Sequence, residues 1–189
     1  MNTIRTGVAA LAVAALAAPA AHANDALKAE AAGVVQAFGD ELKAALGAGM
    51  QEGGPVNALG VCNEKAPRIA AAVTAAKGWT VGRTSLKLRN PNNKPDAWEL
   101  AVLNGFEERL AKGEPAGELA FAEVVDIGGK KQFRFMKAIP TGGVCLNCHG
   151  GADVKPDVEA KVNALYPHDL ARGYAVGDLR GAFSISKDM

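Results

Sequence analysis

Cysteine and histidine are both scarce in this chain of 189 residues, which contains three of each. Two of the cysteines, Cys145 and Cys148, stand close together, and Cys62 is the third. A structural zinc site takes four Cys or His ligands, usually supplied as two close pairs. Because no second pair accompanies Cys145 and Cys148, the sequence disfavours a zinc site.

Long apolar runs are also missing after the first two dozen residues, so no later segment is expected to cross a bilayer. The start of the chain is different. Arg5 supplies a positive charge, residues 7–18 are apolar and rich in alanine, and Ala21-His22-Ala23 matches a small-residue cleavage site. This pattern predicts a signal peptide over residues 1–23, cleaved after Ala23, and a periplasmic or secreted protein that is soluble after cleavage.

Neither sign of charge dominates the mature chain. Loss of Arg5 with the signal peptide lowers the 21 Lys and Arg residues to 20, which equals the 20 Asp and Glu residues. This balance gives no electrostatic reason to expect binding to nucleic acid or to anionic lipid. Residues 24–189 have the length of one domain, and we predict a single domain there.

Cys145-Leu146-Asn147-Cys148-His149 has the C-x-x-C-H spacing of a c-type haem attachment site. Two thiols three positions apart can reach the two vinyl groups of one porphyrin, and the adjacent imidazole can then bind the iron. A redox-active disulfide is the alternative. Covalent haem attachment in bacteria takes place outside the cytoplasmic membrane, so this motif agrees with the predicted export. We predict one covalently attached haem c, held by Cys145 and Cys148, with His149 as an axial ligand.

Four residues are candidates for the other axial ligand of the iron. Cys62 lies on the apolar face of a predicted helix, where a buried cysteine that acts as a small hydrophobic residue is the alternative. His168 stands in a polar turn beside Asp169, which is typical of a surface histidine. Met50 falls in a glycine-rich segment and Met136 on a predicted strand. The residues alone leave this choice open.

The two propionates of a haem also need partners. A guanidinium pairs with a carboxylate through two parallel hydrogen bonds. Arg83, Arg89 and Arg134 lie on or next to predicted strands and are candidate propionate contacts. The alternative for each is a solvated strand residue.

Hydrophobic periodicity predicts helices in the first half of the chain and mainly strands in the second. Predicted helices run from Asn24 to the glycines at 47–54, from Pro55 to Lys77, from Asp96 to Lys112, and briefly from Pro156. Predicted strands lie at 79–88, at 118–127 and 130–139 around a Gly128-Gly129 hairpin turn, and as a pair within 174–185. This order predicts an α+β fold with an antiparallel sheet and a long N-terminal helix.

Several blocks of the sequence resemble one family. These blocks are Cys62 with Ala66-Pro67, residues 78–87, 89–93 and 95–99, residues 145–150, 166–174 and 177–182. They resemble the small secreted c-type haem domains with a PAS-like fold, a family best known from a cyanobacterial protein. The resemblance implies an antiparallel sheet flanked by helices. It also implies His/Cys ligation of the iron, with Cys62 at the cysteine position.

His/Cys ligation carries an expectation about function. A thiolate donates charge to the iron and favours the ferric state, so the haem should have a low potential. Loss of the thiolate on reduction would open a coordination site for CO or NO. The resemblance therefore favours a redox or gas sensor that works with an unidentified redox or signalling protein, and a periplasmic one-electron carrier is the alternative.

Two further expectations concern catalysis and assembly. The sequence shows no catalytic triad, phosphate-binding loop, dinucleotide-binding turn or carboxylate pair, so we predict no enzyme activity. The long first helix is consistent with a homodimer interface or with a helix that faces the core of its own chain. The residues do not decide between these interpretations.

Overall fold

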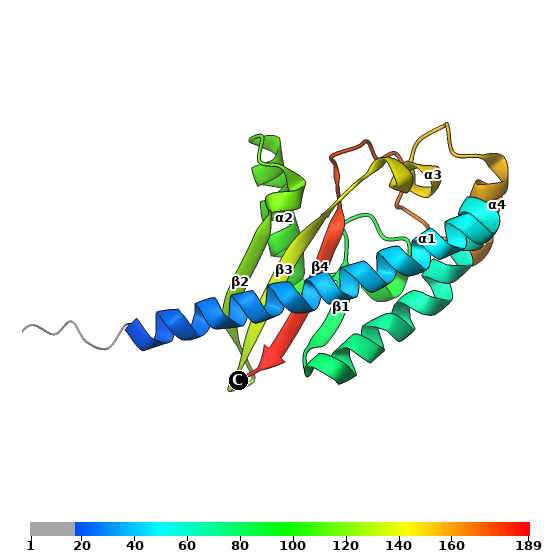
Figure 1. Ribbon diagram of the computed structural model, residues 1–189. Coiled ribbons are helices and arrows are strands. Elements are labelled where there is room, and N and C mark those ends of the chain that lie inside the picture. Colours follow the sequence, from blue (N-terminus) through cyan, green and yellow to red (C-terminus); the bar gives the residue numbers. More distant parts are fainter. Residues whose placement is uncertain (1–17) are drawn as a thin grey trace, which may run out of the picture.

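The computed structural model describes the backbone of residues 18–189 and the side chains of residues 24–189. Four antiparallel strands form one sheet in the order β1-β4-β3-β2, with α1 across one face and α2 on the other (Figure 1). The strands are β1 (Thr80–Thr84), β2 (Ala120–Ile127), β3 (Lys130–Pro140) and β4 (Leu179–Asp188). The helices are α1 (Ala18–Lys77), α2 (Ala97–Ala111), α3 (Leu146–His149) and α4 (Pro156–Leu165). Short 3-10 turns are η1 (Pro91–Asn93), η2 (Ala116–Glu118) and η3 (Gly143–Cys145).

Helix α1 consists of two arms joined by a sharp bend (Figure 1). Gly53 and Gly54 have non-helical backbone angles, and the φ of Gly54 is +66°, which glycine adopts without steric cost. Pro55 follows directly, at the first position of the second arm, where its missing N–H is not needed. The two predicted helices are therefore two arms of one element, and the bend replaces a loop.

The predicted limits of the first helix need correction. The helix begins at Ala18 and not at Asn24, since the alanine-rich residues before Asn24 favour helix. It also continues through Gly47 and breaks only at Gly53. Most of the predicted signal peptide, residues 1–17, lies outside the described residues, so cleavage after Ala23 stays a prediction.

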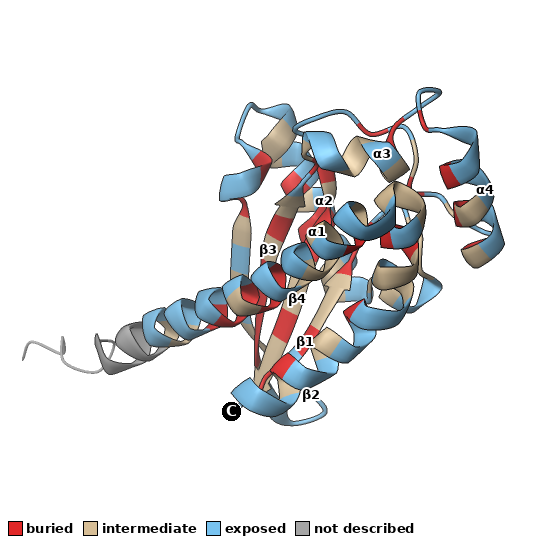
Figure 2. Cartoon of the chain, turned by 45° about the vertical axis from the view of Figure 1, so that its right-hand side comes forward, coloured by how far each residue is buried: buried red, intermediate tan, exposed pale blue. Residues whose placement is uncertain are grey.

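The first arm of α1 lies against the sheet. Its buried residues Ala31, Val34 and Phe38 pack in one cluster with Phe133 and Ile185 of the sheet. Figure 2 shows this burial along the side of α1 that faces the strands. The apolar stripe of this arm thus faces the core of its own chain, and a homodimer stays a prediction.

The strands predicted at 118–127 and 130–139 are confirmed as β2 and β3, whereas the strand predicted at 79–88 is shorter, since β1 ends at Thr84. Gly128 and Gly129 both have positive φ and connect β2 to β3 as a two-residue hairpin turn, as predicted. The predicted strand pair within 174–185 is wrong, because the structure has the single strand β4 there. The preceding residues form a turn, in which the Asp178 carboxylate accepts a hydrogen bond of 2.7 Å from the backbone N–H of Ala175.

Helix α2 covers the opposite face of the sheet. Asp96 caps its N-terminus and forms a reciprocal capping box with Glu99. Buried residues of α2 pack against Met136, Ala138 and Ala182. The predicted α+β class, with an antiparallel sheet flanked by helices after a long first helix, is confirmed. Among the described residues, no helix is both long and apolar enough to span a bilayer.

Candidate functional site

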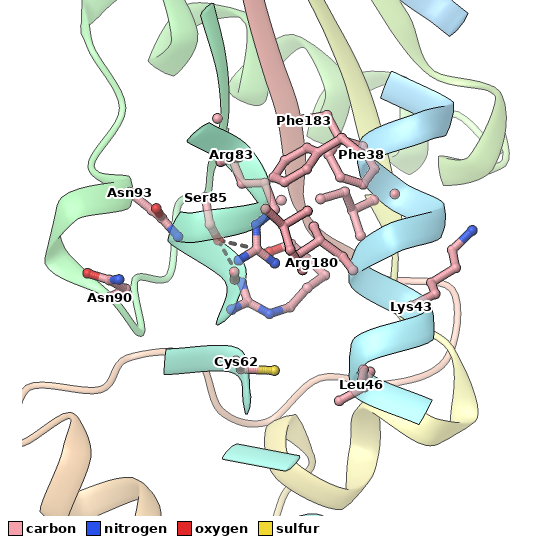
Figure 3. Close-up of a pocket in the computed structure, with 18 of the residues that line it drawn as sticks. Phe38, Lys43, Leu46, Cys62, Arg83, Ser85, Asn90, Asn93, Arg180 and Phe183 are labelled. Carbon is pink, nitrogen blue, oxygen red and sulfur yellow. Dashed lines mark hydrogen bonds between the residues drawn. The ribbon is translucent and has the colours of Figure 1, made fainter. Parts of the chain in front are cut away.

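A cavity of about 1280 Å³ lies between the two arms of α1, the sheet and the segment that contains Cys145 and Cys148. It exceeds the roughly 300–1,000 Å³ that small-molecule sites usually occupy. Phe38 and Phe183 form an apolar wall, and Arg83, Arg180 and Cys62 line the cavity nearby (Figure 3). The cavity therefore combines an apolar wall with cationic groups.

The C-x-x-C-H motif forms one rim of this cavity. It occupies η3 and α3, directly after β3 ends. Cys145 and Cys148 both line the cavity and are free thiols. Cys148 also packs on a cluster that contains Leu59 of the second arm of α1 and Val162 of α4. This packing holds the motif beside the second arm.

His149 is held in one orientation by its Nδ1 atom. Nδ1 lies 2.8 Å from the carbonyl oxygen of Ala171, so it carries the proton and donates it. The lone pair is left on Nε2, and His149 lines the cavity. Burial, with the nearby charges of Arg180 and Arg89, lowers the pKa of His149 to about 3. The imidazole is therefore neutral, with the hydrogen-bonded Nδ1 that metal-binding histidines usually have.

Arg89 and Asp169 hold the segment that orients His149. Their side chains form two hydrogen bonds of 3.0 Å. Arg89 also donates to the carbonyl oxygens of Cys148, at 2.6 Å, and of Ala171, at 3.2 Å. Asp169 accepts the backbone N–H of Ala171 at 3.0 Å. Arg89 lines the cavity, but these contacts occupy its guanidinium, which does not favour the predicted role as a propionate contact.

The four candidates for the second axial ligand fall into two groups. Cys62 lines the cavity from the second arm of α1, and Met50 lines it from the first arm. Met136 is fully buried in the core on the α2 side. His168 is exposed and is not part of the cavity wall. The structure thus brings Cys62 and Met50, but neither Met136 nor His168, to the same cavity as His149.

Cys62 is not the buried hydrophobic residue that was the alternative interpretation. It is exposed, because its side chain opens into the cavity (Figure 3). Desolvation raises the pKa of the Cys62 thiol, and the positive charges of Arg83, Arg89 and Arg180 act in the opposite direction. Desolvation outweighs these charges, so the free thiol keeps its proton and would lose it only on binding a metal as a thiolate.

The other two arginines predicted as propionate contacts, Arg83 and Arg134, lie on opposite faces of the sheet. Arg83 lines the cavity and has no ion pair or side-chain hydrogen bond among the described residues. Arg134 lies on the α2 side of the sheet, where it pairs with Asp96 at 2.7 Å and Glu99 at 3.5 Å and stacks on Trp98. Arg134 therefore does not reach the cavity, because its position on β3 places it on the opposite face from Phe133 and Phe135.

Sequence analysis missed Arg180, which lines the cavity from β4. Its Nη1 donates to Ser85 Oγ at 3.0 Å, and its Nε donates to Nε2 of His149 at 3.4 Å. The guanidinium also lies 5.4 Å from the centre of the Tyr174 ring. Arg180 falls within the resembling block 177–182, which was the one available signal.

Gly181 next to Arg180 allows β4 to approach β1 closely. Its φ is +156°, and a Cβ atom there would overlap the carbonyl oxygen of Thr84. We expect Gly181→Ala to destabilise the fold by more than about 1 kcal/mol, measured by urea unfolding. Gly82→Ala is the control, since its Cβ would meet nothing closer than 3.8 Å. Equal stability of the two variants would contradict the close approach.

The described residues contain few other groups that could bind a metal ion. Within the described part of the chain, no group of three or more His, Cys, Asp or Glu side chains gathers to hold a metal ion. A haem iron takes at most two axial ligands from the protein, so it does not need such a group.

A family model and a solved structure of a known protein point to the same family. A family model described as Tll0287-like matches residues 9–187. The crystal structure of the cyanobacterial haem protein Tll0287 matches with a TM-score of 0.55 and 32% identity, over 68% of this chain and 72% of that one. No curated protein matches the chain. The family model covers more than half of the sequence, and the chain therefore belongs to the Tll0287-like family.

Proposed function

We propose that this protein is an exported haem protein with one haem c, attached through Cys145 and Cys148, with His149 and Cys62 as axial ligands. The observation that carries the proposal is the orientation of His149. Its Nδ1 is fixed to Ala171, and Nε2 keeps its lone pair in a cavity that both thiols of the motif also line. The similarity of this chain to a solved haem protein supports haem as the cofactor.

The residues present fit a haem group. The apolar wall with Phe38 and Phe183 suits a porphyrin ring, and Arg83 offers a cation for a carboxylate. Cys62 adds a sulfur ligand from a separate element of the fold, the second arm of α1. When bound, a haem supplies an iron that takes up and releases one electron.

We favour a redox- or gas-responsive role in the periplasm, on a PAS-like domain, for this protein. Cys62 belongs to α1, whereas His149 belongs to α3 in the motif. Release of the Cys62 sulfur would remove the one ligand supplied by the second arm of α1 and would leave a position for CO or NO. An unidentified redox or signalling protein would then read the change.

A one-electron carrier is the second candidate, and the position of Met50 favours it. Met50 lines the same cavity, and a methionine ligand raises the reduction potential of a haem. A protein in which the iron keeps two protein ligands in both oxidation states suits simple electron transfer.

The visible spectrum of the mature chain, produced in a host that attaches haem c, tests the proposal. We expect haem that stays on the chain after denaturation and a low-spin ferric spectrum with features of thiolate ligation. CO binding after reduction supports the sensing role, and a six-coordinate reduced form that refuses CO supports the carrier. The double variant Cys145→Ser, Cys148→Ser is the control and should lose the covalent haem. A wild-type chain without haem contradicts the proposal.

A further inference from the structure

The charged residues that line the cavity are mostly cationic. They are Lys43, Arg83, Arg89, Lys137 and Arg180, with Asp40 as the acidic one, although the whole chain carries a formal charge of only +1. A cavity with charge of one sign attracts ligands of the opposite sign.

Three of these cations already have partners. Arg89 pairs with Asp169 at 3.0 Å, and Lys43 pairs with Asp40 at 3.8 Å. Lys137 donates to the carbonyl oxygen of Gly117 at 2.6 Å. Among the described residues, Arg83 and Arg180 have no carboxylate within ion-pair distance.

Arg83 and Arg180 are also poorly hydrated. Both are half-buried, and burial lowers the pKa of each guanidinium. The contacts of Arg180 are all with formally neutral groups, namely Ser85, His149 and the Tyr174 ring. Burial of a charge is costly unless an opposite charge is bound. Binding of an anion beside the two guanidinium groups would therefore be favourable.

The contact between Arg180 and His149 links anion binding to metal binding, because Arg180 and a metal ion would use the same atom of His149. With Nδ1 protonated, Nε2 of His149 has one lone pair, which accepts the hydrogen bond from Arg180 at 3.4 Å. The same lone pair is needed to bind iron. Arg180 must therefore give up this hydrogen bond when His149 becomes a ligand.

We propose that Arg83 and Arg180 form an anion-binding site that takes the carboxylates of a haem-type cofactor, and that Arg180 exchanges His149 for a carboxylate when His149 binds iron. This inference rests on the proposed function and names the side chains that recognise the charged edge of its cofactor. A guanidinium suits this role because it donates two parallel hydrogen bonds to one carboxylate.

The test compares Arg83→Gln and Arg180→Gln with the control Arg68→Gln in the haem-loaded mature chain. Arg68 is exposed on the same arm of α1 as Cys62 and does not line the cavity. Two properties are measured, the propionate bending band in the resonance Raman spectrum and the reduction potential. We expect a shifted propionate band and a lower potential in both cavity variants, because each loses a positive charge beside the site, and no change in Arg68→Gln.

The outcomes separate this inference from the proposed function. Loaded Arg83→Gln and Arg180→Gln proteins that match Arg68→Gln in both measurements overturn the anion site and leave haem binding intact. A wild-type chain that carries no haem overturns both. If Arg180→Gln prevents haem attachment, the haem content of the Arg180→Lys variant decides the question. Recovered haem content supports the need for a cation at this position, and equal failure of the lysine variant counts against it.

Discussion

Cys62→Ser is expected to convert the ferric haem from a low-spin to a largely high-spin form and to raise the reduction potential. A serine hydroxyl does not replace the charge that a thiolate donates to the iron. Axial ligands tune haem potentials over several tenths of a volt, so the rise should be on the order of 0.1 V or more. The visible spectrum and a redox titration of the loaded protein measure both effects.

Met50→Leu is the matched control for this prediction. Met50 lines the same cavity from the other arm of α1, and leucine keeps its approximate size without the sulfur. We expect the Met50 variant to keep the spectrum and the potential of the wild type. The reverse result, with a changed Met50→Leu protein and an unchanged Cys62→Ser protein, would make Met50 the ligand and favour the electron carrier.

Asp169→Asn is expected to destabilise the folded chain by about 3–5 kcal/mol, because it leaves Arg89 buried without its negative partner. The side chains of Arg89 and Asp169 are only 9% and 2% exposed. Urea unfolding at neutral pH measures the loss. Asp153→Asn is the control, since Asp153 is exposed and has no hydrogen-bonded partner among the described residues. Equal stability of the two variants would show that the pair contributes little.

The same pair predicts a dependence on pH. Burial by itself would raise the pKa of Asp169, but hydrogen bonds and charge from Arg89 bring this pKa below its usual value. The contribution to stability is complete above the pKa of an unfolded aspartate, about 3.9, and is lost as the pH falls through the lower folded pKa. Below pH 4, the wild type should therefore lose stability faster than Asp169→Asn.

The positions of the helices and strands were largely predictable, because each depends on a local pattern. Apolar residues three and four apart marked both arms of α1, and alternation marked β2 and β3. The predictions were wrong where a local pattern alone does not determine the backbone conformation. Glycines at 47 and 49 did not end the helix, and Asp178 with its neighbours formed a turn where a strand was expected.

The site was only partly predictable. Arg83 and Arg134 both stand on strands, but the sheet carries helices on both faces, so alternation could not tell which face holds the cavity. Asp169 gave no sign of a structural role beyond its place beside His168, whereas its carboxylate binds Arg89, which is distant in sequence. Arg180 had no local signal of its function, since its partners Ser85 and His149 come from other elements.

The sequence by itself determined the proposal of haem c, because covalent attachment would depend on the spacing of Cys145, Cys148 and His149 along the chain. Only the tertiary structure decided which other side chains accompany them. Insertion of β4 between β1 and β3 places Arg180 beside Ser85, and the bend at Gly53–Gly54 brings Cys62 and Met50 to one cavity. These contacts join residues far apart in the chain, so they arise from packing and not from any local pattern.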